Sequence, residues 1–301
     1  MVVFSVIVQP LTDPGGYPHT LPSRGPRVWN DAGDVLSPDA SRMRICLIGD
    51  THGFVPGLQA ALAACRRHAP DLIVHCGDFL TSPFSPDPPG ETIDLLRSEN
   101  VQVIYGNNEA YFRDWGTRRW EATVAGRRRR PDSPDYFLSK IERGQAELAP
   151  ADLAWLRALP GELSLSGARQ GDIYVCHGMP GNPFATIWDT DPAYTPDFTA
   201  EEIDAALSRP AVASADLILC GHTPGPTLLR TTLPGGRTAL VVRSSGQLPG
   251  DGPGPWYQGI CVLTDRGGPL PGYARWNIQF EWAPVEPRDP SWSDPARITA
   301  P

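Results

Sequence analysis

The sequence predicts an α/β fold in which buried parallel strands alternate with helices. Short apolar runs, which indicate strands, alternate along the chain with longer segments whose apolar residues recur at helical spacing. A strand, a helix and a second strand in this order are typical of parallel pairing through right-handed crossovers. In addition, a glycine and a polar residue follow directly after several of the apolar runs.

The individual elements are predicted from their apolar spacing and from their start and stop signals. Residues 45–48 form a continuous apolar run, which indicates a buried strand near the centre of a sheet. In the helix expected at 56–68, a proline occupies the first turn, and Leu58, Leu62 and Cys65 share one face. The other expected elements are strands at 72–76, 101–105, 173–176, 217–220 and 259–264, helices at 92–99 and 152–159, a capping box at 199–202 that begins a helix, and a hairpin of 227–232 and 238–242.

Side chains that can bind metal ions stand just past five of these strands. In chain order they are Asp50 and His52, Asp78, Asn107, His177, and His222. A single Asp-x-His is a weak signal, because it is more often a capped turn with a surface histidine. Five strand ends in one domain are far more specific, since open α/β sheets bind their ligands at the carboxyl ends of strands. Mixed oxygen and nitrogen ligands suit Mn, Fe or Zn, so the sequence predicts a metal centre.

The order Asp-x-His, Gly-Asp, Gly-Asn, His and Gly-His resembles the calcineurin-like metallophosphoesterase superfamily, and most closely its compact bacterial and archaeal phosphodiesterase branch. The segment 176–183, Cys-His-Gly-Met-Pro-Gly-Asn-Pro, is similar to the His-Gly-Ser-Pro segment of that branch, and the helix at 153–160 also fits. The similarity extends from about residue 43 to about residue 265, with an unmatched stretch in the middle. It implies a four-layer α-β-β-α sandwich of two mixed sheets flanked by helices, the metallo-dependent phosphatase fold.

The resemblance also implies a metal-dependent hydrolase that acts on phosphate ester bonds through a hydroxide bridging two divalent metal ions. The implied ligands are Asp50, His52 and Asp78 for the first metal, and Asp78, Asn107, His177 and His222 for the second. Asp78, Asn107 and His52 are the implied catalytic residues. We expect manganese, with Fe, Zn, Ni or Mg as alternatives, and a small phosphate-ester substrate of the phosphodiester or nucleotide type.

The sequence departs from the family pattern at two positions. Asn108 stands where the family commonly has a histidine that helps to protonate the leaving group. Pro224 stands where many members have a further histidine on the first metal, so the first site should be weaker and more open. The Gly-His-Thr-Pro string around it is similar to protein-phosphatase-like branches. A phosphomonoesterase or protein-phosphatase-like enzyme is therefore the alternative, and a metal-poor scaffold without catalysis is another.

Composition restricts the class of protein further. The net charge of -8 argues against a general nucleic-acid-binding surface, although it leaves a nucleic-acid partner open. The six cysteines contain no Cys-x-x-Cys pair and mostly lie in apolar runs, so we expect them to be reduced and buried, as is typical of a cytoplasmic protein. No apolar stretch approaches the roughly 20 residues of a membrane span. The oligomeric state stays open.

The chain divides into three expected parts. Residues 1–42 lack periodicity and are expected to form an irregular extension that folding and catalysis do not need, with Met43 as an alternative start. Residues 43–283 form the expected metallophosphoesterase domain, with an insertion at about 109–149. Within the insertion, the run Arg127 to Arg130 is expected on a loop as a solvated group rather than a nucleic-acid contact. Residues 284–301 are expected to form a loosely attached tail.

Two further residues near the predicted centre have open roles. His75 lies inside an apolar strand and is expected to be a core residue with a hydrogen-bond partner rather than a metal ligand. Arg243 is either a phosphate contact or an ordinary surface arginine.

Overall fold

A computed structural model describes most of the predicted domain. The described residues are 43–80, 88–128, 135–167, 171–189, 195, 198–223, 225–244, 246–248, 256–266 and 272–285. The expected extension at 1–42 lies outside these residues, and so do Pro224, Arg129, Arg130 and the tail beyond Val285.

The first sheet has β1 in its interior, as the sequence predicted. Its order is β11-β10-β1-β2-β3, and β9 pairs with β10. β1 pairs in parallel with β2 and antiparallel with β10, and β2 pairs in parallel with β3. The bounds are β1 Arg44–Ile48, β2 Leu72–His75, β3 Gln102–Val103, β9 Gln247–Leu248, β10 Trp256–Asp265 and β11 Trp276–Val285.

The second sheet has the order β4-β5-β6-β8-β7. Its three inner strands are parallel, and its two edge strands are antiparallel to their neighbours. The bounds are β4 Glu162–Gly167, β5 Gly171–Cys176, β6 Leu217–Cys220, β7 Thr227–Thr232 and β8 Thr238–Arg243. Both sheets are thus mixed, which confirms the predicted sandwich, and β7 with β8 forms the predicted hairpin.

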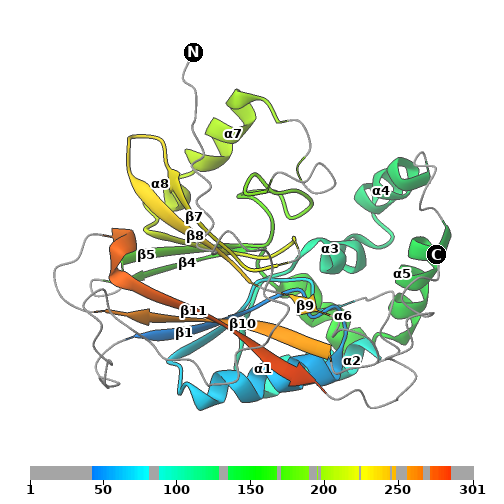
Figure 1. Ribbon diagram of the computed structural model, residues 1–301. Coiled ribbons are helices and arrows are strands. Elements are labelled where there is room, and N and C mark those ends of the chain that lie inside the picture. Colours follow the sequence, from blue (N-terminus) through cyan, green and yellow to red (C-terminus); the bar gives the residue numbers. More distant parts are fainter. Residues whose placement is uncertain are drawn as a thin grey trace.

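Helices cover the outer faces of the two sheets. Figure 1 shows α1 and α2 beneath the first sheet and α7 and α8 beyond the second, which gives four layers. α3 to α6 lie together at one side of the molecule (Figure 1). The bounds are α1 Val55–Arg67, α2 Pro89–Ser98, α3 Asn107–Asp114, α4 Arg118–Arg128, α5 Asp135–Glu147, α6 Pro150–Ala158, α7 Ala200–Leu207 and α8 Pro210–Ala213, with a 3-10 helix at Gly272–Arg275.

The burial of both faces of β1 explains why its sequence is continuously apolar. Successive side chains of a strand point to opposite faces. Ile45 and Leu47 therefore lie in the core between the two sheets, while Cys46 and Ile48 lie in the core between the first sheet and its covering helices. All four side chains are fully buried. The strand that carries the first predicted ligands is thus fixed from both sides.

Some elements were not predicted. The region 109–149 contains most of α3, all of α4 and all of α5, and Arg127 and Arg128 belong to the end of α4 rather than to a loop. Arg-rich α4 has no regular apolar spacing, so its sequence gives no helical period. The strands β4 and β11 were also not predicted. β11 pairs along its whole length with β10.

Two expectations about composition can be compared with the structure. All six cysteines are buried and unpaired, as predicted. Among the described residues, every helix is too short or too polar to cross a lipid bilayer.

The position of Leu47 between the sheets leads to a stability prediction. Leu47→Ala removes buried methyl groups from a packed core and should lower the free energy of unfolding by about 2–5 kcal/mol. Leu47→Met conserves volume and should cost less than about 1.5 kcal/mol. Urea unfolding of the two variants measures both values. Equal midpoints for Leu47→Ala and the parent protein would contradict this packing.

Candidate metal centre

The structure brings all six predicted ligands together at one edge of the sandwich. Two groups of carboxylate and imidazole side chains form, and the potential ligand atoms within each group lie within 4.8 Å of one another. One group contains Asp50, His52 and Asp78, and the other contains Asp78, His177 and His222. Asn107 joins the second group through its side-chain oxygen. Asp78 belongs to both groups, which is the arrangement expected of a carboxylate shared by two metal ions.

The backbone is unusual at these positions. Asp50, His52, Asp78 and His222 have positive φ values of 54°, 46°, 55° and 75°. Residues other than glycine adopt this region uncommonly, and such conformations cluster at functional sites. Hydrogen bonds between the strand ends hold the turns: the His52 amide donates to the Asp78 carbonyl at 2.9 Å. The turns therefore direct the side chains to a common point at a conformational cost.

A neighbouring glycine permits this close approach. A Cβ atom on Gly221 would lie 2.6 Å from Oδ2 of Asp50. The glycine before His222 therefore makes room for the Asp50 carboxylate, which accepts hydrogen bonds from the His222 amide at 3.1 and 3.2 Å.

Three electron-pair donors meet in the second group. Asn107 Oδ1 lies 3.0 Å from His177 Nε2 and 2.9 Å from His222 Nδ1, and the two imidazole nitrogens are 3.3 Å apart. Ligands at right angles around a metal, with bonds of about 2.1 Å, are separated by about 3.0 Å. The spacing of the three atoms matches the edges of such a coordination shell.

The hydrogen bonding of His177 indicates that the facing acceptor atoms need a positive charge between them. Nδ1 of His177 lies 2.8 Å from the Cys76 carbonyl oxygen, which can only accept, so Nδ1 carries the proton. In a neutral ring, Nε2 then has a lone pair that faces Asn107 Oδ1 and, at 3.4 Å, Asp78 Oδ1. Acceptors that face one another repel unless a proton or a metal ion lies between them. The residues therefore fit a divalent metal ion.

The charge states follow the same geometry. Burial alone lowers the pKa of His177, but the carboxylates of Asp78 and Asp50 and the Cys76 carbonyl raise it to about 9. Burial and the nearby His177 charge lower the pKa of His222 to about 4, which leaves its ring neutral and able to bind a metal. Burial raises the pKa of Asp50. Burial also opposes ionisation of Asp78, but His177, His52 and the Asn108 amide outweigh it and lower its pKa.

Asn108 holds the shared carboxylate. Its backbone amide donates to Asp78 Oδ1 at 2.9 Å, and its side-chain amide donates to Asp78 Oδ2 at 2.6 Å. The same side-chain nitrogen lies 3.3 Å from Nδ1 of His52. Asn108 therefore orients Asp78, whereas the resemblance predicts a histidine at position 108.

Glu109 is a structural partner of the centre that was not predicted. Its buried carboxylate accepts hydrogen bonds from the amides of Asp78 at 2.8 Å, Leu80 at 2.7 Å and Gly106 at 2.8 Å. Burial and the Asp78 charge raise the pKa of Glu109 to about 8, although the hydrogen bonds from the Leu80 and Gly106 amides lower it. It thus ties the end of β2 to the start of α3. Glu109 accepts from the Gly106 amide three residues earlier, but glycine has no side chain to complete a capping box, so the sequence gives no clear signal for this role.

Arg243 is not the ordinary surface arginine that was one of its two alternatives. It is buried, and its guanidinium pairs with Asp189 at 2.6 Å and donates to Thr223 Oγ1 at 2.6 Å and to the Gly225 carbonyl at 3.2 Å. It therefore joins the loop after His222 to the loop after His177.

His75 is a buried residue with partners, as predicted: Nε2 lies 3.1 Å from Thr51 Oγ1, and burial lowers its pKa to about 3.

Comparison with known proteins identifies the family. The sequence profile of the calcineurin-like phosphoesterases matches residues 43–226. The chain belongs to this family. Calcineurin-like phosphoesterases are metal-dependent hydrolases of phosphate esters, so the family implies divalent metal ions, and the ligand groups above provide candidate sites for them.

Several solved structures are similar to this chain at low sequence identity. A hypothetical protein from Pyrococcus horikoshii OT3 is 17% identical, with a TM-score of 0.55, and the match covers 85% of this chain and 93% of that one. A metallophosphoesterase from Sphaerobacter thermophilus is 20% identical, with a TM-score of 0.48 and coverage of 82% and 90%. A putative diadenosine tetraphosphatase is 19% identical, with a TM-score of 0.44 and coverage of 82% and 96%. No curated protein sequence matches this chain.

The clamp made by Glu109 leads to a prediction about metal affinity. Glu109→Gln replaces one acceptor with an amide that faces N–H donors, so the turns that carry Asp78 and Asn107 should loosen. Losing such a supporting partner typically weakens metal binding by about 10–100-fold. Calorimetric titration of the metal-free protein with Mn²⁺ measures this loss. Glu121→Gln, on the exposed face of α4, is the matched control and should bind as the parent does. A lowered unfolding midpoint with unchanged Mn²⁺ affinity would limit Glu109 to a role in folding.

Proposed function

We propose that this chain is a dinuclear phosphoesterase that hydrolyses phosphodiester or nucleotide-type substrates. The single observation that carries the proposal is the pair of ligand groups that share Asp78. When bound, two divalent ions neutralise the phosphate, lower the pKa of a water between them and stabilise both oxygens of an in-line displacement.

The side chains divide into two proposed ligand sets. Asp50, His52 and Asp78 hold the first ion, and Asp78, Asn107, His177 and His222 hold the second. Only Asp50 and Asp78 are carboxylates, so two divalent ions keep a net charge of about +2 toward an anionic substrate. Asn107 contributes an oxygen without adding negative charge. The mixture of oxygen and imidazole nitrogen favours manganese, with Fe, Zn, Ni or Mg as alternatives.

The alternatives differ in what they require of the same residues. A metal-poor scaffold would not need six ligand side chains packed against one another at some cost, so their convergence supports a catalyst. A phosphomonoesterase remains the alternative suggested by the Gly-His-Thr-Pro string. A panel of phosphomonoesters, cyclic nucleotides and dinucleoside polyphosphates, assayed with Mn²⁺, distinguishes between substrate classes. The predicted cytoplasmic location stays a prediction.

The unequal ligand sets lead to a prediction about metal retention. The first ion has three protein ligands and the second has four, so the first should be lost more readily on dialysis and activity should return with Mn²⁺. Asp78→Asn weakens both sites and should reduce metal content below one ion per chain and turnover to background. Asp94→Asn, on the exposed face of α2, is the matched control. Elemental analysis after dialysis gives the metal content. Equal retention of both ions would contradict the asymmetry.

The hydrogen bonds of Asn108 lead to a prediction about the leaving group. An amide cannot protonate a departing alkoxide, so nitrophenyl diesters should be cleaved much faster than alkyl diesters. Asn108→His provides a titratable donor and should raise the ratio of alkyl to nitrophenyl rates by about tenfold or more. Asn108→Ala removes the contact to Asp78 without adding a donor, so both rates should fall together. A ratio that is equal in the two variants would show that this position does not assist departure.

A further inference from the structure

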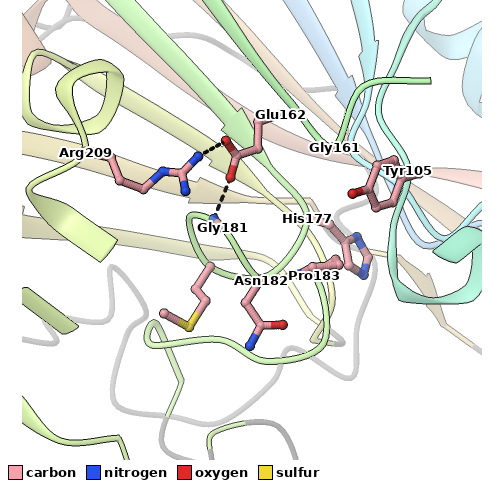
Figure 2. Close-up of a pocket in the computed structure, with 9 residues that line it drawn as sticks. Tyr105, Gly161, Glu162, His177, Gly181, Asn182, Pro183 and Arg209 are labelled. Atoms are coloured by element: carbon pink, nitrogen blue, oxygen red, sulfur yellow. Dashed lines mark hydrogen bonds and ion pairs between the residues drawn. The ribbon is translucent and has the colours of Figure 1, made fainter. Parts of the chain in front are cut away.

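A pocket lies directly beside the candidate metal centre. Its volume is about 390 Å³, and its lining includes Tyr105, Glu162, His177, Met179, Asn182 and Arg209. His177 belongs both to this pocket and to the second ligand group, so a substrate phosphate at the metal centre would have the pocket next to it. Figure 2 shows Tyr105 and His177 on one side of the pocket and Arg209 with Glu162 on the other. The size suits a small organic group.

Arg209 is held in place but keeps free donors. Its guanidinium pairs with Glu162 Oε2, and the Gly181 amide donates to Glu162 Oε1, so both carboxylate oxygens are engaged (Figure 2). The Arg209 side chain is 45% exposed. Its remaining N–H groups make no hydrogen bond to the described part of the chain. A fixed, partly exposed guanidinium presents N–H groups in a planar fork to a ligand.

The charge of the pocket limits the kind of group that it accepts. Among its lining residues, Arg209 and Glu162 carry opposite charges and neutralise each other. A second phosphate at this end would have to compete with Glu162 for the guanidinium. An uncharged group with hydrogen-bond acceptors can use the free donors of Arg209 and leave the ion pair intact. The pocket therefore favours a neutral polar group over a polyphosphate chain.

The opposite wall offers flat and apolar surfaces. The Tyr105 ring is half-buried, and the Arg113 guanidinium lies over one of its faces, 4.0 Å from the ring centre, which fixes the ring and leaves the other face for a ligand. Met179 and Pro183 provide apolar surface on the loop after β5. Aromatic rings bind nucleobases by stacking, and arginine donates to acceptors on base edges. Both features occur here, at opposite sides of the same pocket.

We propose that this pocket binds the nucleobase of a substrate whose phosphate lies at the metal centre, with Arg209 as the residue that recognises the edge of the base. This proposal rests on the proposed function, since it assumes that the phosphate of the ligand binds the metals. Glu162 positions Arg209, and Tyr105 contacts the face of the base.

Equilibrium binding tests the proposal without relying on catalysis. The Mn²⁺-loaded protein is titrated calorimetrically with inorganic phosphate, ribose 5-phosphate and adenosine 5′-monophosphate. The nucleotide should bind about tenfold or more tightly than ribose 5-phosphate, because Arg209 donates hydrogen bonds to the edge of the base and stacking adds to them. Arg209→Gln should remove most of this difference and leave phosphate binding unchanged. Glu162→Gln should reduce the difference as well.

A matched ion pair elsewhere provides the control. Arg237 pairs with Asp216 and is 44% exposed, close to the value for Arg209, but it does not line the pocket. Arg237→Gln should therefore keep the full preference for the nucleotide. A preference that disappears in this variant too would overturn the assignment to Arg209, as would one that persists in Arg209→Gln.

The outcomes also separate this proposal from the proposed function. Equal binding of ribose 5-phosphate and the nucleotide, or no binding of the nucleotide at millimolar concentration, overturns the base-binding pocket. A nucleotide preference that depends on Arg209, in a protein that cleaves no phosphate ester with Mn²⁺, supports the pocket and contradicts the catalytic function instead.

Discussion

The structure of the site depends on one constraint, which is that atoms bearing lone pairs are packed against one another. His177 Nε2 faces Asn107 Oδ1 and Asp78 Oδ1, while its Nδ1 proton is committed to the Cys76 carbonyl. Such an arrangement repels unless positive charge lies within it, either as a proton on His177 or as a metal ion. Metal binding and protonation of His177 therefore compete, and affinity for the metal should fall as the pH is lowered.

The fold stabilises this unfavourable cluster by attaching each ligand to a buried strand or helix end. β1 is fixed from both faces, and the positive φ values occur immediately beyond such strands, where tertiary contacts can impose them. Glu109 and Arg243 then join neighbouring loops around the centre. Conformational strain at the site is thus offset by burial elsewhere.

The elements that the sequence predicted are those whose patterns arise from burial. β1, β2 and β6 are apolar because both of their faces are covered, and α7 begins at Thr199 with the predicted capping box. The ligands were predictable because they directly follow these strands. β11 alternates only weakly, being largely half-buried at the edge of the sheet, and α4 has no regular period. Glu109, Arg243 and Arg209 act through contacts with residues distant in the sequence, such as Glu162 for Arg209, and no local pattern shows which partner a side chain will meet.

Electrostatics connects the metal centre to substrate choice. The chain carries a net charge of -8, so its general field repels phosphate esters, and attraction has to come from a local source. In the dinuclear centre that we propose, two divalent ions provide this attraction, because the centre contributes only two carboxylates against their four positive charges. The adjoining pocket adds no net charge, since Arg209 and Glu162 neutralise each other. Under the proposed function, positive charge is therefore confined to the metal centre, and the walls of the pocket select a ligand by shape and hydrogen bonding. This separation favours a substrate with one phosphate group at the metals and a neutral organic group beside it.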